Sequence, residues 1–97
     1  MQSYNIIIAK RFTDELGEIL GFIALSNPNQ AVKFNNEIYA KIASLATNPY
    51  RCRANTIAND TNVRDMIFKG YVVVFAIDEF AKCVEILGIY KNNLWKP

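Results

Sequence analysis

The segment from Val63 to Ile89 constrains the fold most, because it predicts three consecutive strands joined by two tight turns. Lys69-Gly70 separates the first two apolar runs, and a two-residue loop ending in glycine favours a β-hairpin, since glycine accepts the positive φ that such loops require. Asp78-Glu79 interrupts the apolar pattern before the third run. The middle run, Tyr71 to Ile77, is apolar at nearly every position and is therefore predicted to be a central strand.

Chain length and composition limit the class of protein. With 97 residues, the sequence predicts a single domain, residues 1–97, and 52% apolar with 21% charged residues is a globular composition. No apolar run reaches the roughly 18 residues of a membrane span, and the N-terminus lacks the basic region and apolar core of a signal peptide. We therefore expect a cytoplasmic protein.

Histidine is absent, which excludes several kinds of functional site. Cys52 and Cys83 alone provide too few soft ligands for a structural zinc ion, so we expect no metal. Ser-His and Cys-His nucleophilic mechanisms are also excluded. The sequence contains no glycine-rich phosphate loop of the kind that binds a nucleotide cofactor. Any catalysis must rely on Lys, Arg, Tyr and carboxylate side chains, without a cofactor.

The N-terminal part of the chain predicts a strand followed by a helix. Tyr4 to Ala9 is a β-branched run that suits a strand at or near the edge of the sheet. From Phe12 onward the apolar spacing becomes helical, and Thr13 is predicted to cap this helix. The apolar stripe of the helix consists of Phe12, Leu16, Ile19, Leu20 and Ile23.

A second helix has a clearly marked start. Asn27 is the predicted N-cap, Pro28 occupies the first helical position and Gln30 lies three residues after the cap. The helix is expected to end near Asn48, because a proline follows it. Its apolar stripe consists of Ala31, Phe34, Ile38, Ile42 and Leu45.

These elements together predict an α+β fold. Residues 50–62 lack periodicity and predict a loop with at most a short extended piece. The order is then an N-terminal strand, a two-helix hairpin and a three-strand antiparallel meander, with the helices packed on one face of the sheet. Residues 51–97 carry seven basic and five acidic side chains, against four of each in residues 1–50. The resulting net charge of +2 is too small to indicate nucleic-acid binding.

Several strings, taken in order, resemble the RelE/ParE superfamily of toxins from bacterial toxin–antitoxin pairs. They are the helix from Pro28 to Leu45 before Asn48-Pro49, VRDM at residues 63–66, the strands YVVVFAI and CVEILGI, and the ending NLWKP. Family members typically read "VREL", "YRIVYRV" and "VEILRVLH" in the three strands, and the ParE branch adds a tail ending in Trp-Pro. The resemblance covers essentially the whole chain and is closer to the ParE branch.

The resemblance implies one of two activities. ParE-like members resemble gyrase inhibitors with no established hydrolytic chemistry, whereas RelE-like members resemble ribosome-dependent endonucleases that cut mRNA. A cognate antitoxin neutralises both types, so the expected partners are an antitoxin and DNA gyrase, with the ribosome and mRNA as the alternative. Growth inhibition and plasmid stabilisation are the implied roles. A homodimer and a toxin–antitoxin hetero-oligomer both remain open.

The same resemblance supplies the candidate site residues. A nuclease would use basic residues at the phosphate, because guanidinium groups stay charged and donate in a bidentate fork. The four candidates for that role are Arg51, Arg53, Arg64 and Lys91. The predicted contacts to a target or to RNA are the same four together with Trp95 and Lys96.

Two departures from the RelE pattern weigh against catalysis. Ala76 stands where an arginine commonly follows the aromatic residue of the strand, and alanine cannot stabilise a charged transition state. The last strand ends in Tyr90-Lys91 in place of the histidine-bearing ending common among these toxins. We therefore favour a ParE-like toxin that acts by binding, with a RelE-like nuclease as the alternative and an inactive, decayed toxin as a third interpretation.

Each candidate also has a structural interpretation. Arg64 would form an ion pair across the sheet, for example with Glu85. Arg51 and Arg53, in the predicted loop of residues 50–62 (the 50s loop), would be solvated. Trp95 would pack on the helices, and the tyrosines at positions 50, 71 and 90 would fill the core with their hydroxyls at its rim. In the functional interpretation, Arg64, the 50s loop and the C-terminal tail frame the sheet face that the helices leave uncovered.

Overall fold

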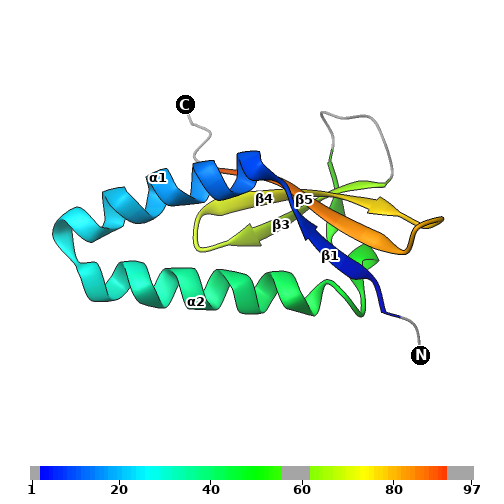
Figure 1. Ribbon diagram of the computed structural model, residues 1–97, viewed down its shortest axis with the longest axis horizontal. Helices are drawn as coiled ribbons and strands as arrows, with labels where there is room; N and C mark the ends of the chain where they lie inside the picture. The colour runs from blue at the N-terminus through cyan, green and yellow to red at the C-terminus, as the bar shows by residue number, and fades with distance from the viewer. Residues whose placement is uncertain (1–2, 56–61, 92–97) are drawn as a thin grey trace.

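Two long helices and a five-stranded sheet make up the computed structural model, which describes residues 3–55 and 62–91 (Figure 1). The strand order is β1-β5-β4-β3-β2, with β1 parallel to β5 and every other pair antiparallel. The α+β prediction is confirmed, with the short strand β2 added to the expected elements. The bounds are β1 Asn5–Ile8, α1 Lys10–Ser26, α2 Pro28–Ser44, the 3-10 helix η1 Pro49–Arg51, β2 Arg53–Ala54, β3 Val63–Phe68, β4 Tyr71–Asp78 and β5 Cys83–Lys91.

The predicted meander is present, and its first turn has the expected chemistry. Lys69 and Gly70 both have positive φ, 49° and 83°, which matches the type I′ geometry that suits the twist of a hairpin. β4 lies between β3 and β5, so the prediction of a central strand is confirmed. Between β4 and β5 the register shifts at Val74/Phe75, where Leu87 is the extra residue of a β-bulge.

Strand β1 lies at one edge of the sheet, as expected, but it covers only part of β5. The pairing stops at Ile8 and Ile86, where the chain enters α1. Beyond that point a side chain of α1 replaces the missing strand, because Glu15 Oε1 accepts a hydrogen bond of 2.9 Å from the backbone N–H of Ile89. Helix α1 therefore continues the edge that β1 begins.

The predicted start of α2 is confirmed, whereas the predicted start of α1 is not. α2 begins as expected, since Asn27 Oδ1 accepts from the Gln30 N–H at 3.1 Å and proline occupies the first turn. The prediction that Thr13 caps α1 is wrong. α1 begins three residues earlier, at Lys10, after the N-cap Ala9, which has no side-chain cap hydrogen bond. The reason is tertiary: the Ala9 N–H donates to the Ile86 carbonyl of β5, so the strand passes directly into the first helical turn.

The C-terminal end of α2 also falls earlier than predicted. The helix ends at Ser44, and the chain leaves it through tightened turns in which the Leu45 and Ala46 N–H groups donate to carbonyls three residues back. Such 3-10-type bonds are a common way to close a last helical turn. The predicted loop then contains η1 and β2.

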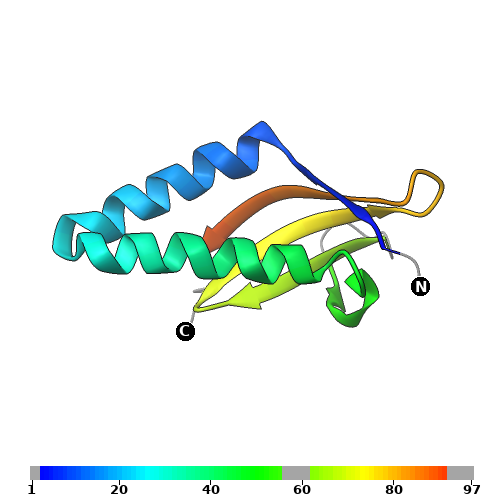
Figure 2. The same ribbon diagram turned by 60° about the horizontal axis from the view of Figure 1, so that its bottom comes forward.

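The two helices cover one face of the sheet, as predicted (Figures 1 and 2). Every residue of the predicted α2 stripe is buried, whereas in α1 only Phe12 and Leu16 are fully buried. The hairpin extends past the ends of the strands in both views, so the C-terminal half of α1 has less of the sheet to pack against. The core side chains from the sheet are Met66, Phe68, Val73, Phe75, Ile77, Val84, Ile86 and Ile89.

Candidate functional site

Arg64 lies on the helix-covered face of the sheet, and the expectation that it frames the uncovered face is wrong. It pairs with Phe75 in the β3–β4 register, two residues before the core residue Met66. Alternation of side chains along a strand therefore places Arg64 on the core side. Its Nη1 donates to the Tyr50 and Cys52 carbonyls at 3.3 and 3.0 Å, and the guanidinium carbon lies 5.0 Å from the centre of the Tyr50 ring. Arg64 thus fastens η1 to β3.

Arg53 lies on the opposite face, next to a buried carboxylate. Its Nε is 3.6 Å from Asp65 Oδ2, and Asn55 Nδ2 donates to Asp65 Oδ1 at 2.7 Å. The Asp65 side chain is only 7% exposed and shares its face with Val74, its partner in β4. The positive charge of Arg53 is therefore opposed locally by a negative one.

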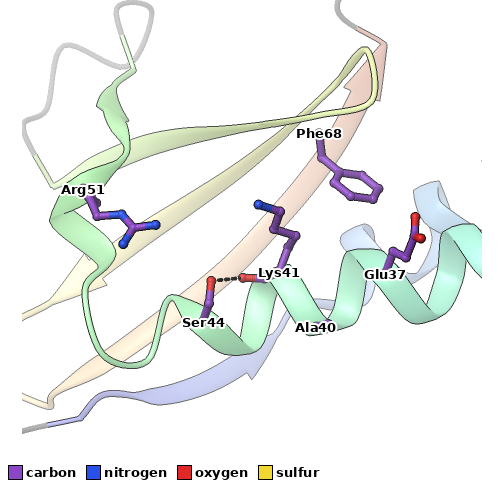
Figure 3. A pocket seen from close by; sticks show the side chains of 6 residues that line it. All are labelled: Glu37, Ala40, Lys41, Ser44, Arg51 and Phe68. Carbon is purple, nitrogen blue, oxygen red and sulfur yellow. Dashed lines mark hydrogen bonds between the residues drawn. The ribbon is translucent and has the colours of Figure 1, made fainter.

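Arg51 belongs to a third environment, a groove beside α2 that is shown in Figure 3. This α2 groove has a volume of about 490 Å³, and its lining residues are Glu37, Ala40, Lys41, Ser44, Arg51 and Phe68. Glu37 pairs with Lys69 at 2.5 Å. Within residues 3–55 and 62–91, neither Lys41 nor Arg51 has an ion-pair partner, so the groove combines an apolar wall with two available cations.

Lys91 lies in a fourth environment, at the end of β5 opposite Tyr71. It lines a second groove, beside α1, together with Glu15 and Glu18. The other two predicted contact residues, Trp95 and Lys96, lie outside the described residues. Arg51 and Arg64 lie close enough to Cys52 for both charges to act on its thiol, whereas Arg53 and Lys91 lie in separate environments. The four described candidates therefore do not all converge on one position.

On the uncovered face near Ala76, the described strands β3, β4 and β5 offer no cation, and Arg53 of β2 on the same face is opposed by Asp65. Ala76 is flanked by Val63 in β3 and by Glu85 in β5. A third groove, of about 410 Å³, lies on this face against the N-terminal half of α1. It is lined largely by apolar residues, including Val63, Val74 and Leu87, and its one cation, Arg11, is paired with Glu15 at 3.0 Å. Such a surface is poorly complementary to a phosphodiester, because the phosphate requires several positive groups or hydrogen-bond donors around it and the charge of Arg11 is opposed by Glu15.

A polar cluster that the sequence analysis missed joins the N-terminus to the β4–β5 turn. Glu79 Oε2 accepts from the Tyr4 hydroxyl at 2.6 Å, and Glu79 Oε1 accepts from Lys82 Nζ at 2.7 Å. The Lys82 ammonium, followed by the Tyr4 and Tyr50 hydroxyls, lowers the pKa of Glu79 to about 2. Tyr4 and Glu79 are 75 residues apart, so no local pattern could have predicted this contact.

The same cluster provides no general acid or base suited to neutral pH. Hydrogen bonding to Glu79 raises the pKa of both Tyr4 and Tyr50, so neither phenol loses its proton readily. Burial raises the pKa of the Cys52 thiol. Proton-transfer catalysis works best with a pKa near the working pH, and these shifts lead away from it. In the described part of the chain, no group of three or more acidic or cysteine side chains could hold a metal ion, and no helix is long and apolar enough to cross a membrane.

The lowered pKa of Glu79 leads to a pH-dependent stability. A carboxylate whose folded-state pKa is depressed stabilises the protein above its ordinary pKa of about 4.3, and this stabilisation is lost as the pH falls toward the folded-state value. We expect Glu79→Gln to lower Tm at neutral pH. The Tm difference from the parent should shrink between about pH 4.5 and about pH 2, as followed by circular dichroism. Glu85→Gln, at an exposed strand position, is the control; a Glu79→Gln difference that stays constant across this range would contradict the expectation.

The matching family model and the similar solved structures all concern toxin–antitoxin systems. The family model of the ParE toxin of the type II toxin–antitoxin system parDE matches residues 6–92. The fold is similar to the chromosomal ParDE TA system from P. aeruginosa, with a TM-score of 0.75, 16% identity, and coverage of 94% of this chain and 98% of that one. It is also similar to the toxin–antitoxin complex RelBE2 from Mycobacterium tuberculosis, with a TM-score of 0.66, 14% identity, and coverage of 94% and 93%.

A search of curated proteins gave no match. The two structural similarities, both below 20% identity, concern the fold alone. The family model, in contrast, spans nearly the whole chain, from the β1 strand to the last residues of β5. The chain therefore belongs to the ParE toxin family of type II toxin–antitoxin systems.

Proposed function

We propose that this toxin acts by binding and inhibiting DNA gyrase or a closely similar topoisomerase, and that it does not cleave RNA. The observation that supports this most directly is the dispersal of the candidate cations. Arg53 faces a buried carboxylate, Arg64 is bound to backbone carbonyls, and Lys91 lies beside the acidic residues of α1. A nuclease stabilises a pentavalent phosphate with several donors aimed at one point, and this arrangement requires preorganised geometry.

The absence of an unopposed cation around Ala76 on the described part of the uncovered face supports the same proposal. Ala76 and its neighbours present apolar side chains and Glu85 where a nuclease would need positive charge. Protein interfaces are built from such surfaces, with an apolar centre and a polar rim. A role in protein binding therefore agrees better with this face than a role in RNA cleavage.

A cognate antitoxin is the second proposed partner. Both solved structures named above are toxin–antitoxin systems, and the family model describes the toxin half of such a pair. The α2 groove suits an acidic amphipathic segment, because Lys41 and Arg51 can bind carboxylates while Phe68 accepts an apolar side chain. β2 pairs only with Arg64 and Asp65, so within the described residues the outer edge of β3 beyond them is open to strand addition.

The target is tested with purified protein in two parallel assays. We expect the toxin to inhibit gyrase supercoiling of relaxed plasmid and to leave mRNA intact in a translation extract. The alternative activity, a RelE-like endonuclease, would instead appear as cleavage within the ribosomal A site, lost in Arg64→Ala. That result would overturn the proposal of gyrase inhibition.

The antitoxin site is tested with the small acidic protein expected from the neighbouring reading frame. The double variant Lys41→Glu, Arg51→Glu should bind it at least tenfold more weakly, since charge reversal at an interface opposes both association and retention. The double variant Lys10→Glu, Lys33→Glu, at exposed helix positions outside the groove, changes the net charge by the same amount and is the matched control. Equal affinities for the double variant and the control would place the antitoxin elsewhere.

A further inference from the structure

The groove beside α1, introduced above with Lys91, contains large apolar side chains that the described part of the chain leaves uncovered. It has a volume of about 480 Å³ and lies between α1 and the end of the sheet. Phe22 on α1 is 70% exposed and Tyr90 on β5 is 45% exposed. Its lining residues are Glu15, Glu18, Ile19, Phe22, Tyr71, Ile89, Tyr90 and Lys91.

The floor of this α1 groove is fixed by the core. Tyr71 packs edge-on against Phe34 of α2, with ring centres 5.4 Å apart, and Ile89 is buried. Glu15 is held in place by its hydrogen bond to the Ile89 backbone and by Arg11, whose Nε lies 3.0 Å from it. A groove built from such fixed side chains is preorganised for an occupant.

The direction of the chain shows which segment can reach the groove. β5 runs parallel to β1, and its Ile89 lies beside Glu15 of the helix that continues from β1. Lys91, the last residue of β5 and the last described residue, itself lines the groove, so the chain leaves the described part of the structure at the rim of the groove. From Glu15 to Phe22 the helix advances about 10 Å, and six further residues can span up to about 20 Å when extended.

The chemistry of those six residues complements the groove. The segment Asn-Asn-Leu-Trp-Lys-Pro, residues 92–97, contains two large apolar side chains, one cation and no acid. On the groove side, Ile19 and Phe22 provide the apolar surface, and Glu18 has no ion-pair partner among residues 3–55 and 62–91. Because the segment is covalently attached at the mouth of the groove, its effective local concentration is high.

We propose that the α1 groove is the docking site of the chain's own C-terminal segment, with Trp95 packed against Phe22 and Ile19 and Lys96 near Glu18. Tryptophan is well suited to this contact, because its large ring buries much surface and pairs favourably with another aromatic ring. The proposal does not depend on the toxin's target or on its antitoxin.

The experiment uses the single tryptophan of the sequence as its probe. In the folded 97-residue chain, Trp95 fluorescence should be blue-shifted relative to the same chain unfolded in guanidinium chloride. Its quenching by acrylamide should be several-fold weaker. Phe22→Ser should shift the emission toward the unfolded value and increase quenching. Leu25→Ser is the matched control, because Leu25 lies on the same helix, is 85% exposed and does not line the groove.

Two further measurements keep the outcome unambiguous. Far-ultraviolet circular dichroism and Tm must show that Phe22→Ser is folded, and Glu18→Lys should increase quenching without removing any apolar contact. Native emission equal to that of the unfolded chain, or equal emission in Phe22→Ser and the parent, would overturn the proposal. Emission that shifts with protein concentration would also overturn it, by assigning the groove to a second copy of the chain.

Discussion

Phe75→Ala is expected to destabilise the protein by about 3–5 kcal/mol. The side chain is completely buried in the central strand, where it pairs with Ile86 on one side and Arg64 on the other. Removing the ring leaves a cavity that rigid neighbours can fill only partly, and domains of this kind have only about 5–15 kcal/mol of net stability. Chemical denaturation followed by circular dichroism should show a large fall in the denaturation midpoint.

Phe80→Ala is the matched control for that prediction. Phe80 is the same residue type, five positions away in the β4–β5 turn, and it is fully exposed. Its replacement should change the free energy of unfolding by no more than about 0.5 kcal/mol. If the two variants were destabilised equally, the assignment of Phe75 to the core would be wrong.

Arg64→Ala is expected to lower the free energy of unfolding by about 1.5–3 kcal/mol, because it removes a charged donor from two backbone carbonyls. The segment from Tyr50 to Cys52 would lose its hydrogen bonds to β3. Arg64→Lys should restore only part of the stability, since an ammonium lacks the planar fork and stacks less well on Tyr50. Thermal unfolding of the three proteins gives the ranking.

A second readout distinguishes a positioning role of Arg64 from direct contact with the target. Val73→Ala removes buried apolar surface from β4 and has an expected cost of similar size, about 2 kcal/mol. If Arg64 acts by positioning the 50s segment, Arg64→Ala and Val73→Ala should lose little gyrase inhibition at temperatures where both are folded. A selective loss of inhibition in folded Arg64→Ala would instead identify Arg64 as a contact residue.

The side of the sheet on which Arg64 lies could have been predicted from the alternation of residues along β3, although its charge suggested a different place. Arg64, Met66 and Phe68 alternate along β3, so strand periodicity alone puts the arginine on the side of the two core residues. The family resemblance instead led to the prediction that Arg64 contacts a target from the uncovered face. Asp65, the neighbour that does lie on that face, received no role in the sequence analysis.

Local sequence signals determined most of the architecture. The Lys69-Gly70 turn, the Asn27 cap and the apolar stripe of α2 all act within a few residues, so their physical effects can be read directly from spacing. The early start of α1 could not be read in this way, because it depends on a hydrogen bond to Ile86, far along the chain.

The sequence by itself therefore determined the element types, their order and the membership of the ParE family. Only the tertiary structure decided where the candidate cations lie, how Glu15 completes the edge of β5 and how Glu79 joins Tyr4. The physical reason is the range of the interactions. Propensity, capping and turn geometry act between near neighbours, whereas strand register and side-chain pairing across the fold depend on contacts between distant segments, which no local pattern specifies.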